Sequence, residues 1–389
     1  MNRMGKFPIT IGYVTVGDPH DRRTWSGINN FLLMALERRV NRVVTMGPLR
    51  PEPELQLLRW ANQILLRITR KRFHYRDSFL LSRAYARIIK PKLEGVDLIV
   101  APAGLATTAM LQTKVPIVYI NDRCTAGALE YHQILSGLAG FSRTESLKLE
   151  QKALERAALV AYSSHWAAEA AVRSNPSISS KVHVVPFGAN LEKIPSPPEA
   201  RSFPPERLKL LMLGVKWEEK GGPIAYQALQ ELKRRGQAAQ LVVCGCTPPP
   251  EFNDPDLVRE GFLNKNLPAD MARLEHHLRT ADFLILPTRF EAYGIVFCEA
   301  AAYGLPALAS RTGGVPTIVE EGRTGFLFGL EQDGLAYADR IMHLVQRPEE
   351  WQSMRRNARN RYEGTLTWDQ YVSTLLRLLQ EAGLVNMSR

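Results

Sequence analysis

Two glutamates that flank a glycine in the second half of the chain could bind a ligand that carries phosphates and hydroxyl groups. Glu291 and Glu299 are eight residues apart, and Gly294 stands between them, where a buried strand gives way to a helix. Free N–H groups near Tyr293, Gly294 and Ile295, at the start of that helix, form an anion site whose natural ligand is a diphosphate. The two carboxylates can then bracket the same ligand.

A lysine earlier in the chain is a candidate partner for the same anion. Lys220 follows an expected strand and opens a Gly-Gly turn before a helix. A cation at this place faces the same crevice as the Glu291 loop and can neutralise phosphate charge. Taken alone, one lysine or two glutamates at this spacing are common on protein surfaces, so the argument depends on the elements and the sequence around them.

Strand-like runs alternate with helical patterns along the whole chain, which favours parallel α/β units. The strands are expected at residues 9–16, 42–45, 98–101, 115–120, 159–162, 182–185, 208–213, 240–244, 283–287 and 307–310. The helices are expected at residues 28–39, 54–72, 78–89, 143–157, 165–174, 222–235, 268–279, 295–303, 331–345 and 348–364, with a last helix from about Trp368. Ligands of such doubly wound sheets bind at the carboxyl ends of the strands.

A proline-rich stretch separates two series of these units. Between Pro195 and Pro205 the chain cannot hold a regular helix or a central strand. The sequence therefore predicts two tandem doubly wound domains. Their expected bounds are 1–192 for the first domain, 193–206 for the linker, 207–366 for the second domain and 367–389 for a C-terminal helix.

The segments around the candidate residues resemble those of family 4 of the retaining glycosyltransferases. The stretch 287–306 is similar to the E-x7-E signature of that family, and 309–326 and 213–222 are similar to its neighbouring motifs. Two further similar segments, 162–166 and 184–190, lie in the first half. The resemblance implies the GT-B fold, with two Rossmann-like domains facing a central cleft and a C-terminal helix that crosses back to the first domain.

The resemblance also implies a reaction and a set of roles. A sugar would pass with retention from a UDP- or GDP-linked donor to a hydroxyl of a glycan or lipid-linked acceptor, without a cofactor or a metal. Glu291 would lie near the sugar, Glu299 would bind the ribose hydroxyls and Lys220 would bind the diphosphate. The other donor-site residues that it implies are Gly27, Gly214, Lys216, Arg289, Tyr293, Gly294 and Ile295.

One position departs from the family pattern. The family commonly has an arginine directly after the glycine that corresponds to Gly214, and this chain has Val215 there. Lys216 or Arg289 could take its place, or Lys220 and the backbone alone could hold the phosphates. Arginine and lysine are not equivalent at a bidentate phosphate site, so the phosphate contacts are open at this stage.

Three residues of the first half are candidates for the acceptor or sugar side. Ser26 and Gly27 match the end of a glycine-rich loop of the family, although Ser26 could instead be a helix N-cap. Asp122 follows an expected strand where many relatives carry a histidine close to the reacting carbon. It could orient the donor sugar, or it could simply form a turn at the strand end.

The positive charge of the chain is concentrated in its first quarter. Residues 1–92 hold 18 Lys and Arg against 6 Asp and Glu, and the whole chain has a net charge of +11. Within this region the segment 59–76 mixes cations with Trp60, Phe73 and Tyr75, as membrane-surface helices do. The expected location is cytoplasmic, because the four cysteines suit a reducing compartment. This charge adds the expectation of peripheral binding at an anionic membrane, although a basic helix face can also serve solubility alone.

Other functions fit less of the sequence. A nucleotide-sugar epimerase shares the expected architecture but lacks the family 4 pattern at 291–326. Nucleic acid is not an expected partner, because no zinc finger or RNA-recognition signature accompanies the charge. A scaffold that binds a nucleotide-sugar without turnover is disfavoured because Glu291, Glu299 and Lys220 are all present. The sequence also shows no signal-peptide core and no pattern of paired zinc ligands among its four cysteines.

Overall fold

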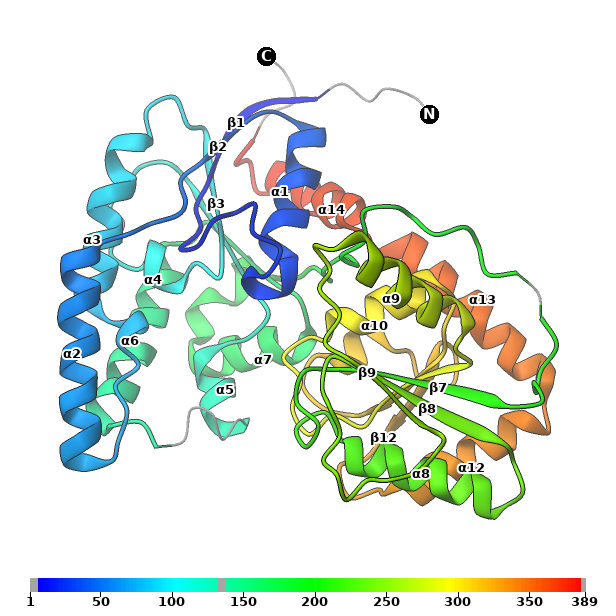
Figure 1. The fold of residues 1–389 in the computed structure, drawn as a ribbon. Coiled ribbons are helices and arrows are strands. Elements are labelled where there is room, and N and C mark those ends of the chain that lie inside the picture. Colours follow the sequence, from blue (N-terminus) through cyan, green and yellow to red (C-terminus); the bar gives the residue numbers. More distant parts are fainter. Residues whose placement is uncertain (1–5, 132–136, 200, 386–389) are drawn as a thin grey trace. The chain divides into compact units, whose positions relative to one another are not determined.

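The computed structural model describes residues 6–131, 137–199 and 201–385 (Figure 1). The chain forms two compact units. Unit 1 comprises Met1–Pro186 and Trp368–Arg389, and unit 2 comprises Phe187–Thr367. Each unit contains one six-stranded sheet.

Unit 1 is built on a parallel sheet with the strand order β2-β1-β3-β4-β5-β6. Its strands are β1 (Phe7–Tyr13), β2 (Val40–Thr45), β3 (Leu98–Pro102), β4 (Ile117–Asn121), β5 (Leu159–Tyr162) and β6 (Val182–Val184). Its α-helices are α1 (Ile28–Arg39), α2 (Glu52–Thr69), α3 (Phe79–Ile89), α4 (Leu105–Thr108), α5 (Thr125–Tyr131), α6 (Gly140–Arg156), α7 (His165–Ser174) and α14 (Trp368–Glu381). Short 3-10 helices are η1 (Thr24–Gly27), η2 (Tyr75–Asp77), η3 (Lys90–Lys92) and η5 (Pro176–Lys181).

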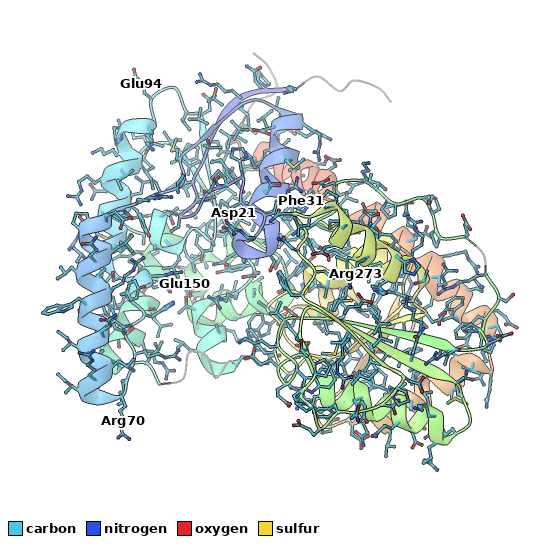
Figure 2. All side chains as sticks on the ribbon, viewed as in Figure 1. Asp21, Phe31, Arg70, Glu94, Glu150 and Arg273 are labelled. Atoms are coloured by element: carbon cyan, nitrogen blue, oxygen red, sulfur yellow. The ribbon has the colours of Figure 1, made fainter. Side chains whose placement is uncertain are left out.

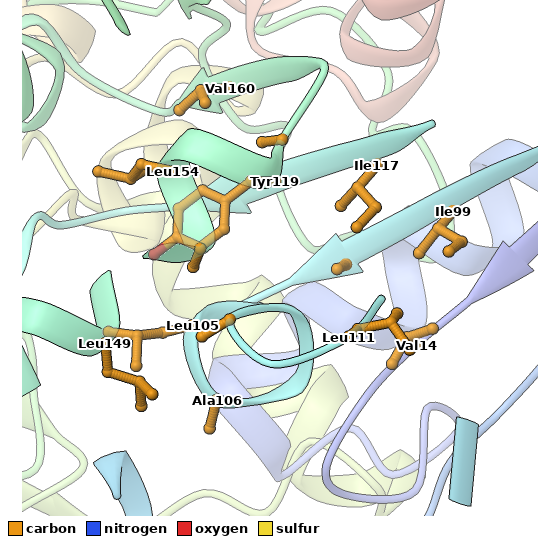
Figure 3. Packing of buried hydrophobic residues seen from close by; sticks show 14 of the residues in the cluster. Val14, Ile99, Leu105, Ala106, Leu111, Ile117, Tyr119, Leu149, Leu154 and Val160 are labelled. Atoms are coloured by element: carbon orange, nitrogen blue, oxygen red, sulfur yellow. The ribbon is translucent and has the colours of Figure 1, made fainter. Parts of the chain in front are cut away.

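The core of unit 1 lies between this sheet and its helices (Figure 3). Strands β3, β4 and β5 are buried along their whole length, so they read as continuous apolar runs rather than as alternating patterns. Figure 3 shows side chains of the sheet packed against those of α4 and α6, among them Ile99, Ile117, Tyr119, Val160, Leu105, Ala106, Leu149 and Leu154.

The C-terminal helix returns to unit 1, as the resemblance implied. Helix α14 buries Trp368, Tyr371, Val372, Leu375, Leu376 and Leu379. These positions follow the spacing of one helix face. The helix packs against α1, and Arg38 of α1 pairs with Asp369 at 2.9 Å.

Unit 2 repeats the architecture with the strand order β12-β11-β10-β7-β8-β9, again all parallel. Its strands are β7 (Leu208–Leu213), β8 (Ala239–Cys244), β9 (Leu257–Gly261), β10 (Phe283–Leu286), β11 (Ala307–Ser310) and β12 (Gly325–Phe328). Its helices are α8 (Gly222–Arg234), α9 (Pro268–Thr280), α10 (Ile295–Ala302), α11 (Val315–Ile318), α12 (Gly334–Val345) and α13 (Pro348–Thr365). Helices α8 and α12 lie side by side on one face, and α10 packs against α13 on the other (Figure 1).

The proline-rich stretch packs against unit 2. Phe203 stacks on Trp351 with ring centroids 4.1 Å apart, and Arg201 pairs with Asp282 at 2.9 Å. The division into units falls after Pro186, earlier than the boundary expected at residue 192. The reason lies in Phe187, which is fully buried and lies against Tyr293 of unit 2 with ring centroids 5.2 Å apart.

Candidate functional site

The strand order of unit 2 brings the Lys220 loop and the Glu291 loop together. Strands β7 and β10 are neighbours, but β7 continues through α8 to β8 on one side and β10 continues through α10 to β11 on the other. In open α/β sheets ligands bind outside the carboxyl ends of the strands at such a reversal. Lys220 follows β7 and Glu291 follows β10, so both stand at this reversal.

Two glycines shape the turn that carries Lys220. A Cβ on Gly214 would lie 2.7 Å from Cγ of Lys220, so the missing side chain makes room for the lysine stem. Gly221 is the N-cap of α8 and has a φ of +74°. A Cβ there would lie 2.0 Å from the carbonyl oxygen of Pro287. Only glycine fits this approach of the α8 turn to the loop after β10.

Lys220 and Glu291 form an ion pair. The Nζ of Lys220 donates to Oε2 of Glu291 at 2.5 Å, and the two side chains are 20% and 16% exposed. Backbone hydrogen bonds hold the loops around the pair. The N–H of Arg289 donates to the carbonyl of Glu219 at 2.8 Å, and the N–H of Gly314 donates to the carbonyl of Glu291 at 3.2 Å. The loops after β7, β10 and β11 therefore form one connected rim.

Helix α10 begins at this rim. Gly294 is its N-cap with a φ of +99°, and a Cβ there would lie 2.6 Å from the ring of Phe297 and 3.1 Å from Cγ of Glu291. The first N–H groups of a helix have no partner within the helix, so Ile295 and its neighbours can donate to an anion. The Tyr293 side chain points inward instead: it is 2% exposed and its hydroxyl donates to the carbonyl of Phe187 at 2.9 Å. Burial raises the pKa of Tyr293 well above its usual range.

Glu299 lies inside α10 and is buried. Its side chain is 1% exposed, and the Nζ of Lys265 donates to its Oε1 at 2.6 Å. Its Oε2 is buried without a hydrogen-bond partner among the described residues. Sequence reasoning missed Lys265, because a single lysine in an expected loop carries no signal of its own. The contact exists only because the loop after β9 reaches helix α10.

The two candidates for the missing arginine have other partners. Lys216 is 52% exposed and pairs with Glu219 at 2.6 Å, three residues along the same turn. The guanidinium of Arg289 donates to the carbonyl of Leu330 at 2.7 Å. Val215, which stands where the family has arginine, is 63% exposed. The cation held against the start of α10 is Lys220.

Unit 1 brings Asp122 to the turn that contains Ser26 and Gly27. Trp25, Ser26 and Gly27 have successive left-handed φ values of 48°, 55° and 88°, which are costly for residues other than glycine. The indole N–H of Trp25 donates to Oδ2 of Asp122 at 2.9 Å. Gly27 is the N-cap of α1 without a side-chain cap bond, so the reading of Ser26 as the N-cap is wrong. A left-handed Ser26 cannot take the extended backbone that an N-cap serine needs.

Glu150 of α6, labelled in Figure 2, holds the segment that follows Asp122. The backbone N–H of Thr125 donates to both carboxylate oxygens of Glu150, at 2.8 and 2.9 Å. Burial raises the pKa of Glu150 to about 7. It also raises the pKa of Cys124 to about 12. Cys124 is therefore a packed thiol rather than a thiolate nucleophile.

Within the described ranges, no group of three or more His, Cys, Asp or Glu side chains is arranged to hold a metal ion. The same part of the chain contains no helix that is both long and apolar enough to cross a bilayer.

Residues 197–361, which lie in unit 2 and contain Lys220, Glu291 and Glu299, match the family model described as glycosyl transferases group 1. The D-inositol 3-phosphate glycosyltransferase of Xylanimonas cellulosilytica is 33% identical over 212 residues, which cover 49% of this chain and 49% of that protein. The GDP-mannose-dependent alpha-(1-6)-phosphatidylinositol monomannoside mannosyltransferase of Mycolicibacterium smegmatis is 29% identical over 179 residues, which cover 41% and 46%. The chain thus spans about half the length of these two relatives.

Solved structures match over almost the whole chain. Sucrose-phosphate synthase from Thermosynechococcus elongatus superposes with a TM-score of 0.67 at 19% identity, covering 96% of this chain and 98% of that one. HepE from Anabaena, in complex with UDP-glucose, superposes with a TM-score of 0.64 at 14% identity, covering 96% and 100%. At these identities the likeness shows the fold, and the predicted fold class is confirmed. The chain has the GT-B fold, and residues 197–361 of its second unit match the family model of the glycosyl transferases group 1.

Proposed function

We propose that this protein is a retaining glycosyltransferase of family 4, which moves a sugar from a nucleotide-diphosphate donor to an acceptor hydroxyl. One observation carries the proposal. Lys220 and Glu291 meet at 2.5 Å beside the N-terminus of α10, and both stand at the strand reversal of the unit that matches the family model. A cation, a helix N-terminus and a carboxylate at such a reversal suit a sugar diphosphate.

In this proposal unit 2 binds the donor. The Nζ of Lys220 and the N–H groups at Gly294 and Ile295 take up the charge that develops on the departing diphosphate. Glu299 accepts hydrogen bonds from the ribose, and Glu291 binds hydroxyls of the sugar once the phosphates compete for Lys220. The leaving phosphate itself helps to deprotonate the incoming hydroxyl. Because Lys220 and the N-terminus of α10 take up the phosphate charge, the proposed reaction uses no cofactor and no metal. Lys216 and Arg289 act less directly, because each has another partner.

Unit 1 is proposed to bind the acceptor, a glycan or a lipid-linked sugar. The proposed contacts are made by Asp122 and by the turn that contains Ser26 and Gly27. The indole N–H of Trp25, in the same turn, donates to Asp122 at 2.9 Å and so holds the two together. The donor base is either uracil or guanine. The HepE structure holds UDP-glucose, and the Mycolicibacterium relative is named as GDP-mannose-dependent, so both classes are tested.

The function is tested by incubating the protein with UDP- and GDP-linked sugars and analysing both the nucleotide and the sugar of each donor. We expect release of the nucleoside diphosphate from one donor class, accelerated by an acceptor, with the transferred sugar keeping its anomeric configuration by NMR. Epimerised nucleotide-sugar would instead establish an epimerase. An intact donor throughout the panel would leave a non-catalytic binding protein and contradict the proposal. Inversion at the anomeric carbon would contradict only the retaining mechanism.

We also propose that helix α2 binds the surface of an anionic membrane. Of its side chains only Leu58 is buried, while Trp60 and Ile68 are 64% and 77% exposed. A shallow hollow of about 480 Å³ is lined by Trp60, Ala61, Ile64, Leu65, Ile68, Thr69, Phe73 and Phe141. Arg70 stands at the end of this helix (Figure 2), and Lys71 follows it. Apolar side chains rimmed by cations suit the headgroup boundary of such a membrane.

Two kinds of substitution are expected to weaken membrane capture in different ways. Replacing Arg70 and Lys71 by Glu removes electrostatic attraction of about 1 kcal/mol per cation, so capture by phosphatidylserine vesicles falls at low salt. Replacing Trp60 and Ile68 by Ser removes the apolar contact, so the fraction that stays bound at high salt falls. Co-sedimentation measures both, with Leu335→Ser, an exposed apolar position of unit 2, as the matched control. Equal capture by phosphatidylcholine vesicles with and without phosphatidylserine would refute the membrane proposal.

A further inference from the structure

Glu299 has one carboxylate oxygen that the fold leaves without a partner. Lys265 donates to Oε1 at 2.6 Å, whereas Oε2 is buried and has no hydrogen-bond partner among the described residues. The side chain as a whole is 1% exposed. A buried acceptor without a hydrogen bond is unfavourable, and such atoms in native proteins usually have a ligand or a water as partner. The unpartnered oxygen is therefore an acceptor suited to a hydroxyl or an amide of a bound molecule.

Lys265 is presented to Glu299 by a loop of defined shape. The N–H of Asn264 donates to the carboxylate of Asp270 in the first turn of α9 at 2.9 Å. The N–H of Leu267 donates back to the carbonyl of Asn264 at 2.8 Å. These bonds fix the turn on both sides of Lys265. The lysine stem, 40% exposed, reaches from this turn to a carboxylate that is almost fully covered.

This ion pair differs from the surface pairs of the unit. A pair between exposed groups is worth little, but a buried carboxylate that loses its cation is strongly destabilised. Lys265 therefore pairs with this buried carboxylate while occupying only one of its two oxygens. The geometry gives the carboxylate a fixed orientation in which Oε2 remains an acceptor.

We propose that Lys265 is a positioning residue for the nucleotide ribose. It holds the Glu299 carboxylate in a fixed orientation through Oε1, so that Oε2 accepts a hydrogen bond from a ribose hydroxyl. The inference rests on the proposed role of Glu299 in donor binding and adds to it a residue of the β9–α9 loop. Lys265 acts on the ribose through Glu299. Its removal therefore weakens the binding of nucleotides that carry the ribose hydroxyls and not the binding of those that lack them.

The experiment compares UDP and GDP with their 2′,3′-dideoxy forms by calorimetric titration. For the wild type we expect the ribonucleotide to bind at least about tenfold more tightly than the dideoxy form, as for hydrogen bonds to a charged acceptor. In Lys265→Met the ratio of the two affinities is expected to fall close to one, and the same result is expected in Glu299→Gln. Lys265→Arg is expected to restore part of it, because the positive charge returns. If Lys265 had a purely structural role, Lys265→Met would weaken the binding of both forms equally and leave the ratio of their affinities unchanged.

Lys233→Met is the matched control, because Lys233 also pairs with a carboxylate of unit 2, that of Asp254 at 2.7 Å, but lies outside the proposed site. Its ribose preference is expected to match that of the wild type. If Glu299→Gln loses the preference and Lys265→Met keeps it, the role of Lys265 is wrong and the donor site stands. If Glu299→Gln also keeps the preference for the ribonucleotide, Glu299 does not bind the ribose, and the proposed role of Lys265 is wrong as well. If no nucleoside diphosphate binds the wild type, the proposed function itself is wrong.

Discussion

Lys220→Ala is expected to lower kcat/KM for the nucleotide-sugar by a factor of about 100 to 1,000, the usual effect of removing one group that stabilises transition-state charge. Lys220 is the cation that the structure holds against the start of α10, through its 2.5 Å bond to Glu291. Without it, the charge of the leaving diphosphate is met mainly by the backbone N–H groups at the start of α10. Steady-state release of the nucleoside diphosphate measures the effect.

The control for this prediction lies four residues earlier in the same turn. Lys216 is 52% exposed and paired with Glu219, so Lys216→Ala is expected to change kcat/KM by less than about threefold, the scale of a surface ion pair. Lys220→Arg keeps the charge but not the shape, and we expect partial activity. Lys220→Ala with wild-type turnover, or Lys216→Ala with the larger loss, would assign phosphate binding to the wrong lysine.

Gly221→Ala is expected to lower the free energy of unfolding of unit 2 by about 2–5 kcal/mol and to abolish turnover. The left-handed φ of +74° costs roughly 1–2 kcal/mol for a residue with a Cβ. The new methyl group would also lie 2.0 Å from the Pro287 carbonyl oxygen, and overpacking adds about 1–3 kcal/mol. Relief of that contact requires the loop after β10 to move, which separates Lys220 from Glu291.

Helix α8 supplies the control at its other end. Gly236 has a φ of +81°, but nothing lies within 4 Å of its Cβ position, so Gly236→Ala isolates the cost of the backbone conformation. We expect this variant to lose only about 1–2 kcal/mol and to remain active. Urea unfolding, with hydrogen exchange of peptides from 207–366 to localise the change, measures both variants. Equal losses in the two variants would show that the approach of Gly221 to Pro287 does not matter.

The elements that hold the site could be predicted closely because their signals are local. Helix α10 was expected at 295–303 and is found at Ile295–Ala302, and the strand Ala307–Ser310 was placed without error. Strand β9 was missed. Its sequence, Leu-Val-Arg-Glu-Gly, is polar because it pairs on one side only, with β8. Strand β12 was likewise missed: its first two residues close the segment 309–326, which was compared with the family motif and not assigned to an element.

The contacts that define the site were less predictable, because they join residues far apart in the sequence. The meeting of Lys220 and Glu291 followed from the expected sheet, but the Lys265–Glu299 pair depends on the path of the loop after the missed β9. The bond from Trp25 to Asp122 depends on a left-handed turn that composition does not reveal. The sequence indicated charge and aromatic residues in the 59–76 segment, but only the structure shows that Trp60 and Ile68 are exposed.

Calorimetric titration with UDP, GDP and the corresponding monophosphates shows whether the rim around Lys220 and Gly294 is a nucleoside-diphosphate site. We predict that one diphosphate binds the wild type at least about tenfold more tightly than its monophosphate, as expected for a charge-assisted contact to the second phosphate. We also predict that Lys220→Ala removes most of this difference. Equal affinities for the diphosphate and the monophosphate in the wild type, or a difference that survives in Lys220→Ala, would contradict the account.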